Sequence, residues 1–81
     1  MAQMQPRSGQ SQPMSDLMYD LVTELSNCGQ AVTVLDEYIE DARSENAPEV
    51  QRLFEQIRED EMRHCQMLRD CMRNMVQQGK I

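Results

Sequence analysis

The chain has 81 residues and a formal net charge of −6, and 40% of its residues are hydrophobic. A chain of this length forms one domain at most, and its acidic balance excludes a surface for the phosphate backbone of nucleic acids. The sequence contains no apolar run as long as a transmembrane helix requires. We therefore expect neither nucleic acid nor a membrane as a partner. Chains of this size usually need disulfides, a metal or a partner chain to be stable.

The cysteines are odd in number: Cys28, Cys65 and Cys71, with no Cys-x-x-Cys motif among them. This usage argues against a disulfide framework and predicts buried, reduced thiols. The first residues, from Met1 to Arg7, lack the apolar core of a signal peptide. Both features predict a cytoplasmic protein.

The N-terminal residues 1–14 are rich in Gln, Ser, Gly and Pro without an apolar period, so we expect a disordered tail there. The first predicted helix covers about 15–44. Ser15 is a suitable N-cap, and Asp16 places an anion in the first turn, where the helix dipole favours it. Apolar residues then recur in alternating steps of four and three, which is a heptad stripe. This stripe consists of Leu21, Leu25, Cys28, Val32, Leu35, Ile39 and Ala42.

The second predicted helix covers about 48–77. Pro48 suits the first helical turn, and Gly79 is a suitable stop, which leaves 79–81 as a short C-terminal tail. The stripe of this helix has the same alternating steps. It consists of Val50, Phe54, Ile57, Glu61, His64, Leu68, Cys71 and Met75.

Two long helices joined by a short loop pack antiparallel, so the predicted fold class is an all-α two-helix hairpin over residues 15–78. Each helix has an apolar face too wide for a single partner helix to cover. The economical arrangement is a homodimer in which two hairpins form a four-helix bundle, and the alternatives are a larger ring or a filament of hairpins.

Glu61 and His64 occupy two consecutive positions of the otherwise apolar second stripe. Their spacing of three residues puts both side chains on one helix face. A carboxylate and an imidazole are costly in an apolar seam unless they pair with each other or bind a metal. Glu-x-x-His projecting inward is the half-site of carboxylate-bridged di-iron bundles, whereas a buried Glu–His hydrogen bond that sets the register is the metal-free alternative.

The run from Arg58 to His64, followed by Met67 and Leu68, resembles the second metal helix of ferritin-like proteins such as rubrerythrins. The layout as a whole is similar to the encapsulated ferritins, which are single hairpins that build a four-helix site by dimerising. The helix start precedes the Glu-x-x-His motif at the distance seen there, and a tyrosine of that family falls at Tyr38.

This resemblance, which covers about residues 24–70, implies a ferritin-like four-helix bundle that binds iron, at a single or di-iron site, between the Glu61 and His64 side chains of two chains. It also implies oxidation of ferrous iron by dioxygen. The expected assembly is a dimer or a multiple of dimers, in the cytoplasm or inside a protein compartment such as an encapsulin shell.

One position departs from that family. The family places a metal-binding Glu seven residues before the tyrosine, where this chain has Ala31, and this argues against a complete ferroxidase centre. A hairpin folded about residue 46 also brings Ala31 opposite Glu61. The nearest inward carboxylate is Glu24, about 10 Å away along the helix axis, and we expect it as the third metal ligand. Cys28 lies closer and is an alternative ligand, although a buried cysteine is more often part of the core.

A second resemblance leaves a structural role open. A hairpin with a Pro-Glu helix start, a Glu- and His-containing middle and a Met-rich end is similar to the spore coat protein F family. That family is ferritin-like in fold but structural in role, so the resemblance implies a coat or interaction module with a degenerate, metal-free site, located in the spore coat. A helical adaptor or secretion chaperone is a third alternative, which only the small size and acidic charge favour.

Overall fold

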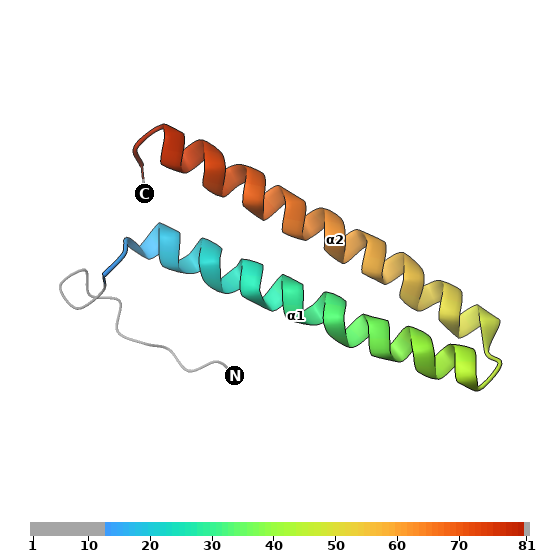
Figure 1. Cartoon of the computed structure of the whole chain (residues 1–81). Helices are drawn as coiled ribbons and strands as arrows, with labels where there is room; N and C mark the ends of the chain where they lie inside the picture. The colour runs from blue at the N-terminus through green and yellow to red at the C-terminus, as the bar shows by residue number, and fades with distance from the viewer. Residues whose placement is uncertain (1–12, 81) are drawn as a thin grey trace.

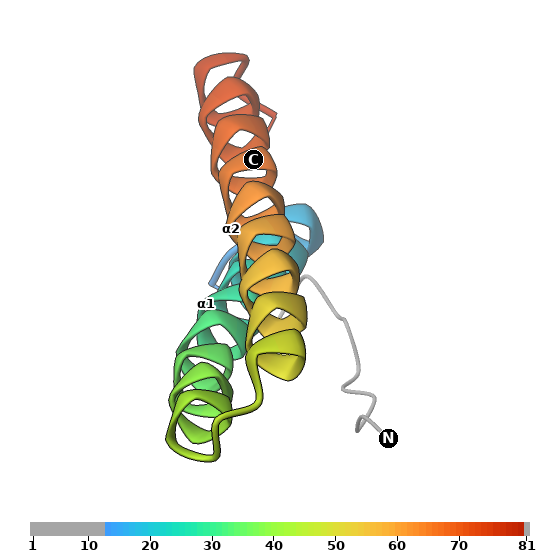
Figure 2. The same cartoon turned by 90° about the vertical axis from the view of Figure 1, so that its right-hand side faces the viewer.

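The computed structural model of the chain describes residues 13–80, which form an antiparallel hairpin of two helices (Figure 1). Helix α1 spans Asp16–Ser44 and helix α2 spans Pro48–Gln77. Within residues 13–80 there is no strand, so the predicted all-α hairpin is confirmed, and both helices agree with their predicted ranges to within one residue. The two helices lie close together at the turn and spread apart towards the chain ends (Figure 1), and they cross each other in the view of Figure 2.

Both helix starts follow from local chemistry. The Ser15 side chain accepts a hydrogen bond of 3.1 Å from the Met18 amide and so satisfies one of the free N–H groups at the start of α1. Helix α2 has no side-chain cap and begins instead with Pro48, whose fixed φ suits the first turn and whose missing N–H needs no partner. Each first turn carries an acid, Asp16 or Glu49, that complements the positive end of the helix dipole.

The turn between the helices is a Schellman motif. Asn46 has a positive φ of 55°, its amide donates to the Arg43 carbonyl at 3.1 Å, and the Ala47 amide donates to the Ala42 carbonyl at 2.9 Å. Asparagine tolerates this left-handed conformation better than other residues with a side chain. The chain therefore reverses about Asn46, and α2 returns along α1 with no slack in the loop.

Helix α2 ends in the same motif, at the stop that the sequence predicts. Gly79 has a φ of 72°, and the Lys80 amide donates to the Met75 carbonyl at 3.0 Å. Most residues of the two predicted tails lie outside the part of the chain that the structure describes. Of residues 1–14 the structure describes only Pro13 and Met14, and of residues 79–81 it describes only Gly79 and Lys80.

Two contacts across the hairpin establish its register. The rings of Tyr38 and Phe54 lie 5.5 Å apart between centroids, and Arg58 Nε donates to Asp36 Oδ1 at 2.6 Å. Both pairs are nearly symmetric about the turn at Asn46. The same symmetry places Glu61 opposite Ala31, and these two residues do line one hollow together.

The core of the hairpin is small. Four residues are buried, all on the predicted stripe of α1: Cys28, Leu35, Ile39 and Ala42. Helix α2 has no buried residue. Many large hydrophobic side chains are exposed instead, so the single hairpin leaves most of its apolar surface uncovered.

The predicted stripe of α2 is half wrong. Phe54, Glu61, Leu68 and Met75 do lie half-buried in the seam. The positions beside them differ from the prediction, because the structure half-buries Gln51, Arg58, Cys65 and Met72 and leaves Val50, Ile57, His64 and Cys71 exposed.

Helix α2 is therefore rotated about its own axis relative to the predicted stripe, so that Arg58 faces α1. The physical reason for this rotation is the pairing of Arg58 with Asp36. A long amphipathic side chain covers apolar surface with its stem while its charged end stays in water, so Arg58 closes one side of the seam as an apolar residue would. The apolar residues of the predicted stripe are then left on the other, open side.

Neither helix of the described residues is long and apolar enough to cross a membrane.

The turn geometry gives a first prediction. Asn46→Ala should lower the free energy of unfolding by about 1 kcal/mol, because the left-handed backbone conformation is less favourable for alanine than for asparagine. Asn46→Gly, which has no such penalty, is the matched control and should stay within a few tenths of a kcal/mol of the parent chain. Urea denaturation of the three chains at one protein concentration measures both differences. Equal losses in the two variants would contradict this account of the turn.

Candidate functional site

The open side of the hairpin carries three hollows of about 310, 500 and 390 Å³, which follow one another from the turn towards the chain ends. Tyr38 lines the first and second hollows, and Glu61 lines the second and third, so the three form one continuous groove. This groove, between the open sides of α1 and α2, is called the open face below.

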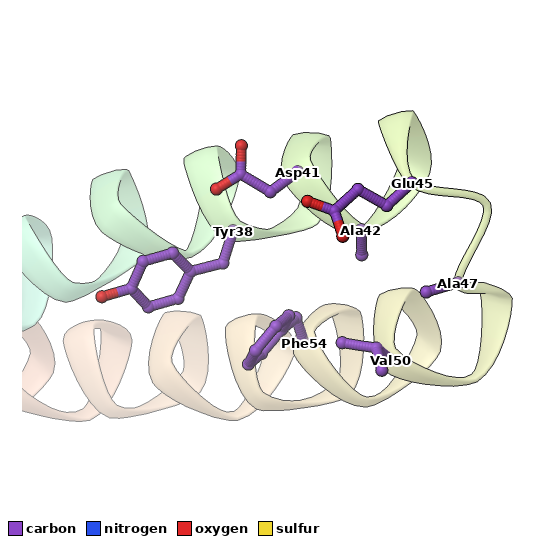
Figure 3. A pocket seen from close by; sticks show the side chains of 7 residues that line it. All are labelled: Tyr38, Asp41, Ala42, Glu45, Ala47, Val50 and Phe54. Carbon is purple, nitrogen blue, oxygen red and sulfur yellow. The ribbon is translucent and has the colours of Figure 1, made fainter.

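The turn end of the open face is apolar. Figure 3 shows Tyr38 and Phe54 facing each other across the two helices, with Ala42 and Val50 nearer the turn. Among the described residues, the charged ones that line this hollow are two acids, Asp41 of α1 and Glu45, the C-cap residue that follows it. Tyr38 keeps 45% of its surface exposed here, which is a large exposure for a ring that already packs on another.

Glu61 and His64 meet as their spacing predicts. His64 Nδ1 lies 2.9 Å from Glu61 Oε1. The environment differs from the predicted apolar seam, because the side chain of His64 is 56% exposed and that of Glu61 is 25% exposed. Glu61 stands at the seam and His64 beside it on the open face, so a single hairpin pays little of the desolvation cost that the sequence suggested.

Glu24, the third predicted ligand, lines the same hollow as Glu61 and His64. It is exposed, and the register places it level with Leu68, two helical turns or about 10 Å from the level of Glu61. Among residues 13–80, no three His, Cys, Asp or Glu side chains are close enough to hold a metal ion together. One chain therefore brings Glu24, Glu61 and His64 to one surface without assembling a site.

Cys28, the alternative ligand, lies at the seam between the levels of Glu24 and Glu61. Burial raises the pKa of its thiol to about 11, with further contributions from a hydrogen bond and charge interaction with Cys65 and from the charges of Glu61 and Glu24. The thiol is thus protonated at neutral pH and a poor metal ligand in the isolated hairpin. Its contact with Cys65 is a feature that the sequence analysis missed, because it depends on the rotated seam of α2.

Comparison of the chain with models of protein families, with curated proteins and with solved structures gives no match in any of the three. The resemblances drawn from the sequence therefore remain predictions.

The raised pKa of Cys28 predicts how stability depends on pH. A thiol whose folded pKa exceeds its ordinary value of 9.0 stabilises the fold below that value, and this contribution is lost as pH rises through about 11. The melting temperature in the presence of a reductant should therefore fall more steeply between pH 9 and 11 for the parent chain than for Cys28→Ala. The variant should melt lower at neutral pH because it loses packing. Parallel pH profiles would contradict the assigned environment of Cys28.

Proposed function

We propose that the chain is a ferritin-like iron-binding protein, in which two hairpins pair through their open faces and hold the metal between them with Glu24, Glu61 and His64. The observation that carries this proposal is that all three ligand candidates lie on one open, partly apolar groove that a single chain leaves uncovered.

The need for a partner comes from the small core. A hairpin with four buried residues offsets little of the entropy of ordering two long helices. The exposed apolar residues of the open face, Val34, Tyr38, Val50, Ile57 and Met67, would contribute to stability once covered. Pairing two such faces gives a four-helix bundle, the common solution for helices with wide apolar faces.

A second copy suits the open face because the groove is centred on the hairpin. Glu61 lies within two residues of the midpoint of α2 (Pro48–Gln77), and Ala31 lies within one residue of the midpoint of α1 (Asp16–Ser44). Two hairpins related by a two-fold axis near this level therefore overlap along almost their whole length. An isologous contact of this kind is the commonest in homo-oligomers.

The same symmetry suits the metal ligands. Glu24 and Glu61 lie at levels about 10 Å apart, and Cys28 and His64 lie midway between them. A two-fold axis that lies in the interface and crosses the helices at this middle level exchanges the two outer levels. Glu24 of one copy then stands level with Glu61 of the other, and the two His64 side chains come closest to the axis.

The resulting donor set fits iron. Two copies supply a Glu from each α1 and a Glu-x-x-His motif from each α2, which is the composition of ferritin-like di-iron sites. The open face also presents acids, Glu24, Asp41, Glu45 and Glu61, while no Lys or Arg of the described residues lines its three hollows. Pairing two such faces concentrates negative charge, which a bound cation offsets. Ferrous iron held by these side chains would be open to oxidation by dioxygen, and the side chains would keep the metal away from bulk water.

The pairing of open faces predicts a change of mass. Ile57→Glu places a charge in the proposed interface and should shift the protein from dimer, or a multiple of dimers, to monomer in sedimentation velocity. Val22→Glu is the matched control, because Val22 is similarly exposed at 41% but lines none of the three hollows. The control should keep the parent mass. A parent chain that is monomeric, or an Ile57→Glu variant of unchanged mass, would overturn the pairing.

The metal site predicts a stoichiometry. Anaerobic titration with ferrous iron, followed by calorimetry, should saturate at a fixed number of ions for each pair of chains. Glu61→Ala should abolish this binding, and Glu24→Ala should weaken it by at least about tenfold, as expected when a ligand is lost. Glu59→Ala, an exposed acid on α2 outside the three hollows, should bind iron as the parent chain does. Binding no stronger than to the buffer would end the iron proposal.

A second candidate function is a structural module of the coat protein F kind, part of a larger protein layer and without a metal. The observation that favours it is the Glu61–His64 hydrogen bond of 2.9 Å, which pairs the two side chains within one chain. In that case a strong chelator leaves both the melting temperature and the solution mass unchanged. Under the iron proposal, chelation lowers the melting temperature of the metal-loaded protein.

A further inference from the structure

We propose that Cys28 and Cys65 form a redox pair that closes to an interhelix disulfide by exchange with a low-molecular-weight disulfide such as oxidised glutathione. The pair lies in the seam between α1 and α2, and the proposal does not depend on iron binding. The sequence predicts buried, reduced thiols, whereas the structure buries Cys28, half-buries Cys65 and leaves Cys71 exposed.

The register of the hairpin puts the two thiols opposite each other. Asp36 and Arg58 pair across the seam at 2.6 Å, and the same register, seven or eight residues further from the turn, brings Cys28 level with Cys65. Cys28 is only 3% exposed, and Cys65 belongs to the half-buried positions of α2 that contact α1. Cys65 also contributes to the raised pKa of the Cys28 thiol, as expected for two thiols that face each other across the seam.

The difference in exposure sets the order of events. Cys28 is closed to a small molecule, whereas the half-buried Cys65 is partly open. The Cys65 sulfur attacks one sulfur of the small disulfide, which forms a mixed disulfide, and the first small thiol leaves with the proton from Cys65. Cys28 then attacks the Cys65 sulfur, and the second small thiol leaves with the proton from Cys28. The two protein thiols are oxidised, and the small disulfide is reduced to two thiols.

Cys71 is the natural internal control. It is exposed and lies on the same helix, beyond Cys65 and away from the turn. Cys71 therefore reacts with the same reagent, but the register gives it no thiol opposite, so its product is a mixed disulfide. Exposure alone predicts the reverse selectivity, with Cys71 as the main site of reaction and Cys28 untouched.

The experiment treats metal-free, folded Cys71→Ser protein with oxidised glutathione and follows intact mass and peptide maps. The expected product has lost two hydrogens, carries no glutathione, and gives a Cys28–Cys65 cross-linked peptide. It should melt at least about 5 °C above the reduced form, since the cross-link restricts the unfolded chain. Cys28→Ser in the same background should stop at a Cys65–glutathione adduct.

Three outcomes would overturn the proposal. The first is a stable glutathione adduct in the Cys71→Ser protein, which means that Cys28 does not reach Cys65. The second is a disulfide between two chains, which means that the thiols pair across an interface. The third is a parent chain whose peptide map links Cys71 to Cys28 or Cys65 in preference to the seam pair. Circular dichroism of each variant before treatment verifies that the tested chains are helical.

Discussion

The three-residue turn around Asn46 determines the register in which α2 packs against α1. Its two backbone hydrogen bonds leave the second helix no freedom to slide along the first, because a shift of register would require a longer loop. Every juxtaposition of functional interest follows from that register. It brings Cys28 level with Cys65, and it keeps Glu24 two turns away from Glu61.

The second determinant is the ion pair between Asp36 and Arg58 on one side of the seam. The pair is partly exposed and contributes little energy as a salt bridge. Its importance is geometric, because the stem of Arg58 occupies a position that an apolar residue would otherwise take. One side of the seam is thereby closed by a polar pair, and the exposed apolar residues Val34, Tyr38, Val50, Ile57 and Met67 line the hollows on the other side. A hairpin with one closed side and one open, partly apolar face is suited to pairing through the open face.

Much of the fold could be predicted from the sequence because it depends on local signals. Ser15, Pro48 and Gly79 mark helix ends through their own backbone and hydrogen-bonding preferences, and the stripe of α1 is unambiguously apolar. The seam of α2 could not be predicted in full, since two stripes share Phe54 and Glu61 and differ only in their flanking positions. Apolarity favours Ile57 over Arg58, whereas the pairing of Arg58 with Asp36 on the facing helix depends on both helices together.

The same distinction applies to the candidate site. The Glu61–His64 contact needs only helical spacing and was predictable. The exposure of His64 and the Cys28–Cys65 contact depend on how α2 is rotated against α1, which is a property of the pair of helices. Whether Glu24 joins Glu61 depends on the quaternary structure, that is, on the symmetry that relates two hairpins. No local pattern in the sequence predicts that symmetry.

Native mass spectrometry of the protein purified with iron tests whether two hairpins hold the metal between them, because it gives the number of chains and the number of bound metal ions in the same particle. Metal is expected only on particles with an even number of chains, in a constant ratio of ions to pairs of chains, and it should be lost in Glu61→Ala. Iron bound to a single chain, or an even-numbered assembly that never carries metal, would contradict this arrangement.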